Sequence, residues 1–451
     1  MNPELQRNLW LELTLRRMLF MAVVVLLIFF AAHAIGGQYG LALAAEYLFY
    51  AITVVWGARN AAQSVVGEIR DRTWDSQRLS ALTPFAMIWG KLLGATSYAW
   101  FGGLMCLAVL LATAFSAGGA IEALSELCYF LAIGLMAQSV ALFASLLAVR
   151  RRQAHSRLDV FFYQLAGLVA AWGLWSVWGL VSPVGGAVLV REDFAWWAMA
   201  LDSRVFYLVS LLVFLAWAVF GCYRLMRLEL QMQNSPTAWI GFMVFMAVYM
   251  AGFDAWGAAQ PDWFAGDGVA TRLHIAALTL GFLTYLAVAM EPKDRVLYRW
   301  LADAMRRKKY AALLGRLQAW MIAYAGTIIL VLIFVVRVAT VSTPPGGQPG
   351  EVIAVVLAAL GFVTRDLAIF LLFHFLPGQR RGELPALITL AMLYGVAPQI
   401  AGLTGLDNPF FYPVPAGWQG PVISWMEAAV AWGALVVLDK RAKDAALPAG
   451  S

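Results

Sequence analysis

The sequence predicts an all-α fold, that of a polytopic integral membrane protein with twelve transmembrane helices arranged as two six-span repeats. Three observations lead to this prediction: the composition, the spacing of the apolar runs and the placement of the basic residues. Of the 451 residues, 62% are hydrophobic and only 13% are charged. A soluble protein of this length could not bury so much apolar surface, so we expect lipid to be the main solvent of the chain.

Apolar runs of about 20 residues, the length that crosses the hydrocarbon core of a bilayer as a helix, recur along the whole chain. The first run lacks a small-residue cleavage site and further runs follow it, so we expect it to be retained and not removed as a signal peptide. We interpret the runs as twelve spans, near residues 18–37, 41–66, 88–116, 124–149, 158–182, 205–223, 237–257, 272–290, 318–340, 352–376, 384–404 and 420–438.

Basic residues gather in alternate connecting segments. If the N-terminus is cytoplasmic, the cytoplasmic segments hold 26 of the 32 Lys and Arg, counting Lys91 at the edge of its span. The opposite loops hold three, Arg191, Arg204 and Arg272. This asymmetry follows the positive-inside rule and predicts a multi-pass cell-membrane protein, typical of a bacterial inner membrane, with both termini cytoplasmic. Because the basic residues are spread over many short loops, the net charge of +6 does not indicate nucleic-acid binding.

A charged stretch follows the second span, and a similar one follows the eighth. We name residues 67–91 the first elbow and residues 291–316 the second elbow. Any helix that leaves a membrane on the cytoplasmic side can collect such residues, but the ordered recurrence favours a parallel duplication with halves at 1–235 and 236–451. The recurring features are Glu68, Asp71-Arg72, Trp74 and Gly90-Lys91 in the first elbow, and Glu291, Asp294-Arg295, Trp300 and Gly315-Arg316 in the second.

Residues 1–235 resemble a permease subunit of the type-2 class of ABC transporters, which are mostly exporters of drugs, lipids, polysaccharides or peptides. The resemblance rests on the amphipathic stretch NPELQRNLWLELTLRR before the first span, the charged first elbow, a Leu-Thr-Pro turn at 82–84 and the Gly-Lys pair at 90–91. The second elbow lacks the Thr-Pro turn and carries four basic residues at 306–309, so its membership rests on the repeat.

The resemblance implies six spans per half and a short cytoplasmic coupling helix in each elbow, which docks on a separate ABC ATPase subunit present in two copies. ATP and Mg²⁺ are expected on that partner, with no cofactor on this chain, because no stretch matches GxxxxGK followed by Ser or Thr. Alternatively, the first elbow lies on the headgroups and its Arg residues contact anionic lipid. The expected coupling residues are Glu68, Arg70, Asp71, Arg72, Thr73, Trp74, Asp75, Arg78, Thr83, Pro84, Glu291, Asp294, Arg295 and Trp300.

The chain is therefore expected to be the permease of an ATP-driven exporter, not itself an enzyme, that moves a lipidic or amphipathic substrate. Two alternatives stay open: a type-2 ABC membrane component that transmits force or assembles an envelope complex without transport, and an ion-coupled secondary transporter. The expected partners are the ATPase, membrane lipid and, in the first alternative, further envelope components. No Ser-His-Asp set, Cys-His set or metal-ligand spacing occurs, so no catalytic or metal-binding residue is expected.

Charges inside the spans are costly and usually functional. Arg365 and Asp366 lie midway along the tenth span. Sequence neighbours do not face each other on a helix, so we expect each to find partners on other spans, with Arg59, Glu46 and Glu427 as candidates. Gln138 takes the corresponding place in the first half, and with Arg365, Asp366, Arg59 and Glu46 it could line a polar path or form a gate latch. Equally, Arg365 and Asp366 could form a buried structural ion pair.

Two further predictions concern the glycines at the start of the third span and the outer segment before the sixth span. The spacing of Gly90 and Gly94 predicts close contact with another helix at the start of the third span. The family resemblance implies that the outer segment 183–204, which is rich in Gly and Trp, forms short re-entrant or interfacial helices before the sixth span. Equally, its aromatic residues could form an interfacial belt.

Overall fold

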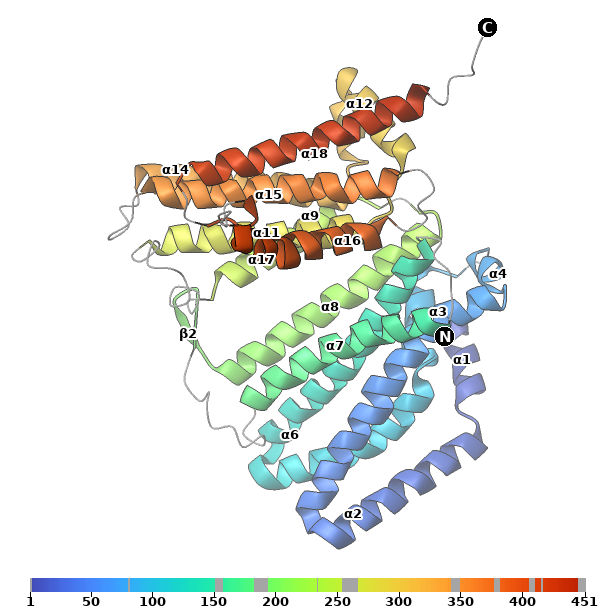
Figure 1. The fold of residues 1–451 in the computed structure, drawn as a ribbon. Helices are drawn as coiled ribbons and strands as arrows, with labels where there is room; N and C mark the ends of the chain where they lie inside the picture. Colours follow the sequence, from blue (N-terminus) through green and yellow to red (C-terminus); the bar gives the residue numbers. More distant parts are fainter. Residues whose placement is uncertain are drawn as a thin grey trace. The chain divides into compact units, whose positions relative to one another are not determined.

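The computed structural model describes residues 2–79, 82–150, 157–181, 194–232, 234–253, 267–341, 349–376, 382–404, 410–414 and 417–444. These residues are almost entirely helical, with one two-stranded hairpin (Figure 1). The chain divides into two compact units, one formed by Met1–Phe194 with Ala200–Asn234, and the other by Ala195–Met199 with Ser235–Ser451.

Unit 1 contains the N-terminal helices. They are α1 (Pro3–Glu12), α2 (Leu15–Phe49), the π-helical segment η1 (Tyr50–Trp56), α3 (Gly57–Arg70), α4 (Trp74–Arg78), α5 (Pro84–Trp89), the π-helical segment η2 (Gly90–Gly94), α6 (Ser97–Arg150), α7 (Arg157–Val181) and α8 (Ser203–Glu229). The hairpin strands are β1 (Phe194–Trp196) and β2 (Met199–Leu201).

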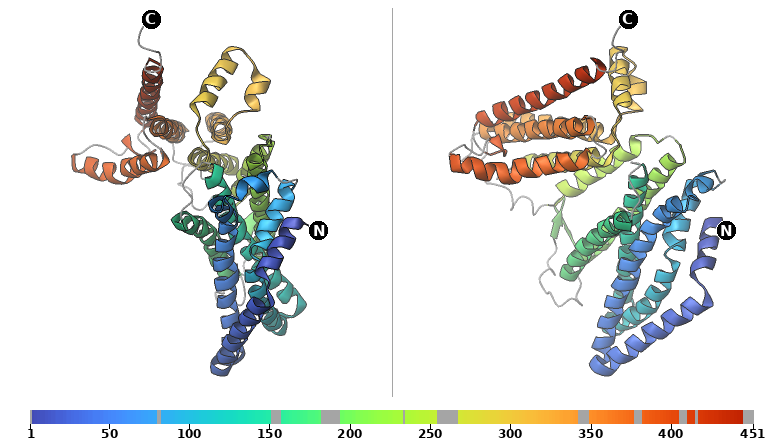
Figure 2. Two further views of the ribbon diagram at one scale, coloured as in Figure 1. Left: turned by 90° about the vertical axis from the view of Figure 1, so that its right-hand side faces the viewer. Right: turned by 45° about the vertical axis from the view of Figure 1, so that its right-hand side comes forward.

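Unit 2 contains the C-terminal helices. They are α9 (Thr237–Ala251), α11 (Gly268–Met290), α12 (Arg295–Arg306), α13 (Tyr310–Leu314), α14 (Ala319–Thr340), α15 (Pro349–Phe375), α16 (Glu383–Ala391), the π-helical segment η5 (Met392–Val396), α17 (Ala397–Thr404) and α18 (Gln419–Asp444). The short helices α12 and α13 project from one end of this unit (Figure 2).

Two long helical segments of unit 1 reverse direction at a glycine. Gly37 in α2 has φ 58° and ψ −145°, and Gly119 in α6 has φ 78° and ψ −160°. Side chains rarely tolerate this backbone conformation, which is why glycine stands at both positions. Gly37 lies at the end of the first expected span and Gly119 lies between the third and fourth, so each reversal falls where the hydropathy pattern places a turn.

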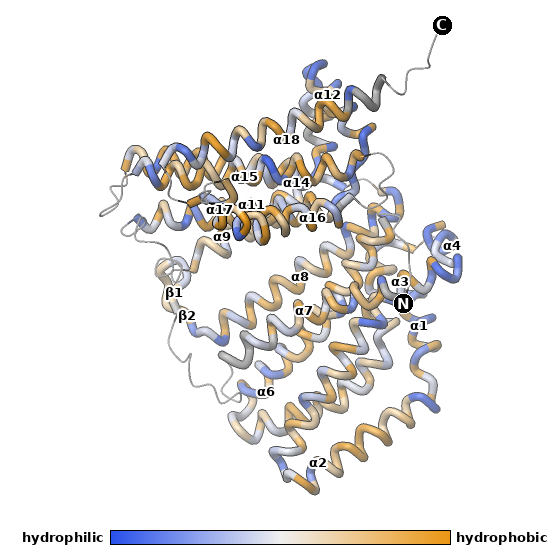
Figure 3. The backbone as a smooth tube through the Cα atoms, in the orientation of Figure 1, coloured by the Kyte–Doolittle hydropathy of each residue, from blue (hydrophilic) through white to orange (hydrophobic). Residues whose placement is uncertain are grey.

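The chain is an all-α membrane-spanning protein. Its described residues hold eight helical segments long and apolar enough to cross a bilayer, and hydrophobic residues cover most of their length (Figure 3). The eight segments are Leu15–Arg70, Ser97–Val149, Ser203–Glu229, Gly268–Met290, Ala319–Thr340, Pro349–Phe375, Leu384–Leu403 and Gln419–Leu438, and two shorter apolar helices cover Asp159–Leu174 and Thr237–Ala251.

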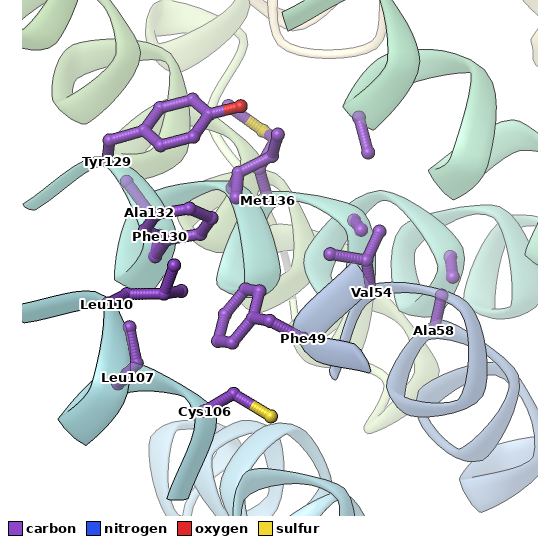
Figure 4. Packing of buried hydrophobic residues seen from close by; sticks show 14 of the residues in the cluster. Phe49, Val54, Ala58, Cys106, Leu107, Leu110, Tyr129, Phe130, Ala132 and Met136 are labelled. Carbon is purple, nitrogen blue, oxygen red and sulfur yellow. The ribbon is translucent and has the colours of Figure 1, made fainter. Parts of the chain in front are cut away.

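The core of unit 1 forms where η1 and α3 pack against α6. Phe49 is fully buried and meets Phe130 edge to face, with ring centroids 5.1 Å apart (Figure 4). Alanines at 58, 61 and 62 are fully buried on α3. Their small side chains let α3 and α6 approach closely. Between helices already surrounded by lipid, such close packing is a main source of stability.

The π-helical segment η1 is stabilised by glutamine side chains. Widening a helix to π geometry frees backbone carbonyls, and these need donors inside a membrane. Gln138 Nε2 donates to the Thr53 carbonyl at 3.0 Å, and Gln164 Nε2 donates to the Val55 carbonyl at 3.0 Å. The Trp100 indole donates to Gln138 Oε1 at 2.9 Å, so the fully buried Gln138 is hydrogen-bonded at both ends of its amide.

The core of unit 2 surrounds α15. Of the candidate spans it is the most deeply buried, with 67% of its most apolar stretch buried inside the fold. It packs against α18 along much of its length, and α11 packs against α14 in the same way. The buried aromatic Phe334 of α14 and the aliphatic Leu367 of α15 belong to the two main clusters of this core.

Residues 194–201 form a hairpin, so the expectation of helices throughout 183–204 is wrong for this part; residues 183–193 lie outside the described chain. Its turn residues, Trp197 and Ala198, have φ of 52° and 61°, the backbone of a tight two-residue turn. The Trp196 and Trp197 indoles donate to the carbonyls of Tyr249 and Val248 at 3.1 and 3.2 Å. Both carbonyls lie in the last turn of α9 and also accept from the Gly252 amide, so the end of α9 holds the hairpin.

Candidate coupling site in the first elbow

Lys91 is the centre of a polar cluster in unit 1. Its side chain is only 1% exposed, and its ammonium forms an ion pair with Glu68. The ammonium also lies 3.9 Å from Glu4 Oε1, 3.3 Å from Gln77 Oε1 and 3.4 Å from the Ser64 carbonyl. A buried ammonium is tolerable only when its charge and all its donors are matched, and this set of acceptors does so.

The cluster joins four elements that are distant in sequence. Glu4 comes from α1, Glu68 from the end of α3, and Gln77 from α4. Gln77 Nε2 donates to Glu68 Oε1 at 2.6 Å, so the same glutamine serves the lysine and its counter-ion. Arg7 of α1 lies 3.4 Å from the same oxygen of Glu68 at the exposed edge. The elbow is therefore fixed to the N-terminal helix by charge as well as by packing.

Asparagine side chains hold α1 against α5 and η2. Asn2 caps α1 by accepting from the Glu4 and Leu5 amides, and its own amide donates to the Ala86 carbonyl at 2.6 Å. One turn further, Asn8 Nδ2 donates to the Gly90 carbonyl at 3.0 Å. Asn2 thus satisfies open amides at the start of α1, and both asparagine amides connect α1 to the backbone of α5 and η2.

Gly90 and Gly94 face α1 directly, which confirms the predicted close helix contact. A Cβ added at Gly90 would lie 2.7 Å from the Glu4 Cβ, and one added at Gly94 would lie 2.8 Å from the Asn8 Cβ. Real Cβ atoms essentially never approach another atom this closely, so either α1 or the glycine helix would have to shift. The glycines are therefore needed for the N-terminal helix to reach Lys91.

The chain turns out of α3 through a helix-ending motif. Arg72 has φ 58°, the Thr73 amide donates to the Glu68 carbonyl at 2.9 Å, and the Arg72 amide donates to the Ile69 carbonyl at 3.1 Å. This is the Schellman arrangement, which leaves its left-handed residue at the surface. It returns α4 beneath the cluster, where the buried Trp74 ring lies 5.3 Å from the Lys91 ammonium.

The outer side of the first elbow is charged and exposed. Asp75 is 88% exposed and pairs with Arg78 at 3.6 Å, a surface pair of the kind that contributes little to stability. The hydrophilic colour of α4 stands out against the apolar α2 (Figure 3). The expected coupling residues thus separate into the buried Trp74, the half-buried Glu68 and Arg78, and an exposed set, Arg70, Asp71, Arg72, Thr73 and Asp75.

Thr83 and Pro84 start α5. The Thr83 hydroxyl accepts from the Ala86 amide at 3.2 Å, and Pro84 occupies the first turn, where its missing N–H costs nothing. These two expected coupling residues therefore also fix where the helix that carries Ala86 begins. Thr83 is exposed and Pro84 is half-buried.

In the second elbow, the acids are used by the fold itself. Glu291 accepts from the Ala319 and Trp320 amides at 3.0 and 3.4 Å and so caps α14, whereas Asp294 caps α12 by accepting from the Val296 amide at 2.8 Å. Carboxylates at these positions complement the positive end of the helix dipole. Unlike Glu68, Glu291 serves backbone amides.

The basic and aromatic residues of the second elbow also pair. The Arg316 guanidinium lies 4.5 Å from the Trp300 ring centre, as the Lys91 ammonium does over Trp74 in the first elbow. Arg295 donates to the Phe375 carbonyl and lies 5.4 Å from its ring centre. Both elbows thus fix a basic residue by an aromatic ring, an interaction that is worth about 0.5–2 kcal/mol.

Tyr298 lies on the inner face of α12. Its hydroxyl donates to Gln318 Oε1, and Gln318 Nε2 donates to the Pro292 carbonyl at 2.9 Å. Burial raises the pKa of the Tyr298 phenol, because the charged form would lose its hydration. Tyr298 therefore stays neutral and holds α12 against the start of α14.

The intramembrane charges of unit 2 form one closed network. Arg365 Nε donates to Asp366 Oδ1 at 2.9 Å, and its Nη1 donates to Glu427 Oε2 at 2.6 Å. The hydroxyls of Tyr285 and Tyr394 each donate to Asp366 Oδ2 at 2.7 Å. Asp366 is fully buried and Arg365 is 4% exposed. The network therefore joins residues of α11, η5, α15 and α18 around an enclosed carboxylate.

Arg365 contacts its sequence neighbour Asp366, as in the alternative of a buried ion pair, because the long arginine stem folds back onto that neighbour. Of the three predicted candidate partners, Glu427 contacts Arg365. The other two candidates, Arg59 and Glu46, lie in unit 1: Arg59 is exposed on α3, and Glu46 is half-buried on α2.

Sequence reasoning missed Lys91, Gln77 and Glu4 as members of the site. Lys91 had a usable signal, because a lysine at the start of an apolar span needs a counter-ion, and Glu68 is the acid at the facing end of the preceding span. Nothing in the local sequence marks Glu4 or Gln77, whose roles depend on how α1 and α4 fold back.

No protein-family model, no curated protein and no solved structure matches this chain.

Proposed function

We propose that this chain is the membrane-spanning permease of an ATP-driven exporter of the type-2 ABC class, which transmits ATP hydrolysis on a separate ATPase subunit to movement of a lipidic or amphipathic substrate. The observation that carries the proposal is the Lys91 cluster. It joins α1, α3, α4 and η2 into one block whose outer side is charged and exposed.

Such a block has the properties that force transmission requires. A partner that closes on ATP can tilt membrane helices only through a rigid handle, because a flexible loop would absorb the motion. The buried ion pair with Glu68 connects the elbow to α3, and Gly90 continues directly into the helices of the next span. A push on the exposed residues around Asp71 would therefore be transmitted to both flanking spans.

The proposed topology has twelve spans with both termini in the cytoplasm. Two of the eight long apolar segments bend back at Gly37 and Gly119, so each can cross the bilayer twice. The shorter apolar helices Asp159–Leu174 and Thr237–Ala251 supply the two remaining crossings. Both elbows, the N-terminus and the C-terminus then lie on the side that carries most of the Lys and Arg.

The proposed assembly has one chain and two ATPase copies. Support comes from the two elbows, which each place a basic residue over a tryptophan, Lys91 over Trp74 and Arg316 over Trp300. In native mass spectrometry, the complex should contain one copy of this chain and two ATPase subunits. Two copies of this chain in each complex would exclude the proposal that its two halves form the whole membrane domain.

The direct test of coupling is charge reversal at the exposed side of the first elbow. The double variant Asp71→Arg with Arg72→Asp should abolish co-purification of the ATPase while leaving insertion of the chain in the membrane intact. The matched control reverses the exposed Glu12–Arg17 pair, 3.0 Å apart in the same unit, and should retain the ATPase. Unchanged ATPase recovery with the first double variant would instead place the elbow on the lipid surface.

A further inference from the structure

A polar cavity of about 280 Å³ lies between α3 and α7 of unit 1. Its lining residues are Arg59, Gln63 and Arg70 of α3 and Val160 of α7. Ligand pockets typically measure about 300–1,000 Å³, so this cavity is at the small end and suits a headgroup rather than a whole lipid.

The three polar residues share one face of α3. Positions 59, 63 and 70 are separated by four and seven residues, which returns each to nearly the same angle on a helix. At 1.5 Å per residue they extend over roughly 16 Å along the helix. A separate face, roughly 110° away around the helix, carries Ala58, Ala62 and Val65, all fully buried against the rest of unit 1. The sequence of α3 thus separates a packing face from a basic face that borders the cavity.

Among the described residues, two positive charges and no acid line the cavity. Within the described part of the chain, neither Arg59 nor Arg70 has an ion pair or a side-chain hydrogen bond. The nearby Glu68 is already engaged by Lys91 and Gln77. Asp159 precedes Val160 on α7. This residue does not line the cavity and already takes part in another interaction. No described residue supplies a counter-charge to these two arginines, so the cavity offers both guanidinium groups to an anion.

The depth of Arg59 within its apolar segment favours the binding of an anion. It lies eleven residues inside the end of the apolar segment Leu15–Arg70, where an unpaired guanidinium is costly in a bilayer. Arg70 is at the end of the same segment and lies at headgroup depth in the proposed topology. An anion held between them would pair the inner charge and connect it to the headgroup region.

We propose that this cavity binds a phosphate group, and that the phosphate is the headgroup of an anionic phospholipid drawn from the adjacent leaflet. Guanidinium forks match the tetrahedral oxygens of a phosphate in two-point contacts, and the Gln63 amide supplies a further donor. The assignment does not depend on the proposed coupling to an ATPase. A soluble phosphate ester offers the same chemistry, so the two sources must be distinguished by experiment.

The test uses native mass spectrometry of the full-length protein released from detergent after addition of phosphatidylglycerol or phosphatidylcholine. The wild type should retain phosphatidylglycerol in preference to phosphatidylcholine. The double variant Arg59→Gln with Arg70→Gln should retain it about tenfold or more weakly, since a change of 1.4 kcal/mol in binding is already tenfold. The matched control removes two exposed charges elsewhere, Lys308→Gln with Lys309→Gln, and should bind as the wild type does.

A second variant guards against loss of folding in the first. Gln63→Glu keeps the size of the side chain and adds a carboxylate to the cavity, so it should also lower phosphatidylglycerol retention. Addition of inorganic phosphate distinguishes the sources: binding of phosphate at millimolar concentration to the wild type but not to the double arginine variant, with no selective lipid retention, would assign the site to a soluble phosphate and still support an anion site. Equal phosphatidylglycerol retention by the wild type, the double arginine variant and Gln63→Glu would overturn the proposal.

Discussion

Lys91 and Glu68 form a buried ion pair between residues 23 positions apart in sequence. Glu68 ends one long helix of unit 1, and Lys91 stands where the next begins. Because the elbow between them carries the exposed charges of Asp71, Arg72 and Asp75, the pair decides whether this surface is a rigid part of the membrane fold or a loose connection.

Removing the lysine should therefore be costly. Lys91→Met leaves Glu68 with Gln77 and the exposed Arg7, and breaking a buried pair from one side costs about 3–5 kcal/mol. We expect a fall of this size in the free energy of unfolding in mixed micelles. The double variant Lys91→Met with Glu68→Gln should be less destabilised than Lys91→Met alone, because no uncompensated charge is left. As a control, Arg17→Gln breaks an exposed pair and should cost less than about 1 kcal/mol.

The glycine contact with α1 gives a prediction without any change of charge. In Gly90→Ala the new methyl group would overlap the Glu4 side chain, so α1 should detach and become accessible to protease. Gly67→Ala is the matched control, because a Cβ there meets nothing within 4 Å and alanine in a helix is favoured by about 0.5–1 kcal/mol. Equal protection of α1 in both variants would show that its docking does not need Gly90.

In unit 2, Asp366→Asn tests whether the enclosed network is structural. The asparagine leaves the Arg365 guanidinium with Glu427 alone and weakens the two tyrosine hydrogen bonds. We expect a loss of folded protein corresponding to about 3–5 kcal/mol, because one partner of a buried pair is removed. Tyr285→Phe removes one donor and should cost about 1–3 kcal/mol. If Asp366→Asn keeps normal folded yield but lowers the stimulated ATPase rate, the network belongs to the transport path or its latch.

The two elbows should contribute unequally to ATPase association. Asp71 and Arg72 are exposed, whereas Asp294 caps α12 and Arg295 binds the Phe375 carbonyl, so the second pair has less surface to offer a partner. Changing Asp294 and Arg295 to alanine should weaken ATPase binding less than the same change at Asp71 and Arg72. Titration of purified ATPase onto each variant measures this, and an equal or larger loss at the second elbow would reverse the ranking.

The membrane-spanning helices could be predicted because lipid makes hydropathy a direct signal. The reversals at Gly37 and Gly119 also fall at or between the expected spans. The hairpin at 194–201 could not be predicted, since its strands depend on carbonyls at the end of α9, more than forty residues away. The π-helical segment η1 was hidden for the same reason, because it is stabilised by Gln138 and Gln164 from other helices.

The candidate site was predicted at its surface but not at its centre. Charged residues such as Asp71 and Asp75 are recognisable in sequence because they interrupt apolar runs. The cluster around Lys91 depends on Glu4, which reaches it only when α1 folds back across Gly90. The pairing of Arg365 with Asp366 was predicted only as an alternative, because a rule for helix faces ignores how far an arginine side chain can bend.

The central proposal is that the first elbow contacts an ATPase, and site-specific photo-crosslinking from Asp75 tests it most directly. Asp75 is 88% exposed, so a benzoylphenylalanine placed there should not disturb the Lys91 cluster. Ile121, which is 82% exposed beside the Gly119 reversal, carries the same probe as the control. We predict that in intact membranes the probe at position 75 crosslinks a P-loop ATPase and the probe at position 121 does not. Crosslinks from position 75 to lipid alone, with no ATPase captured, would contradict the account.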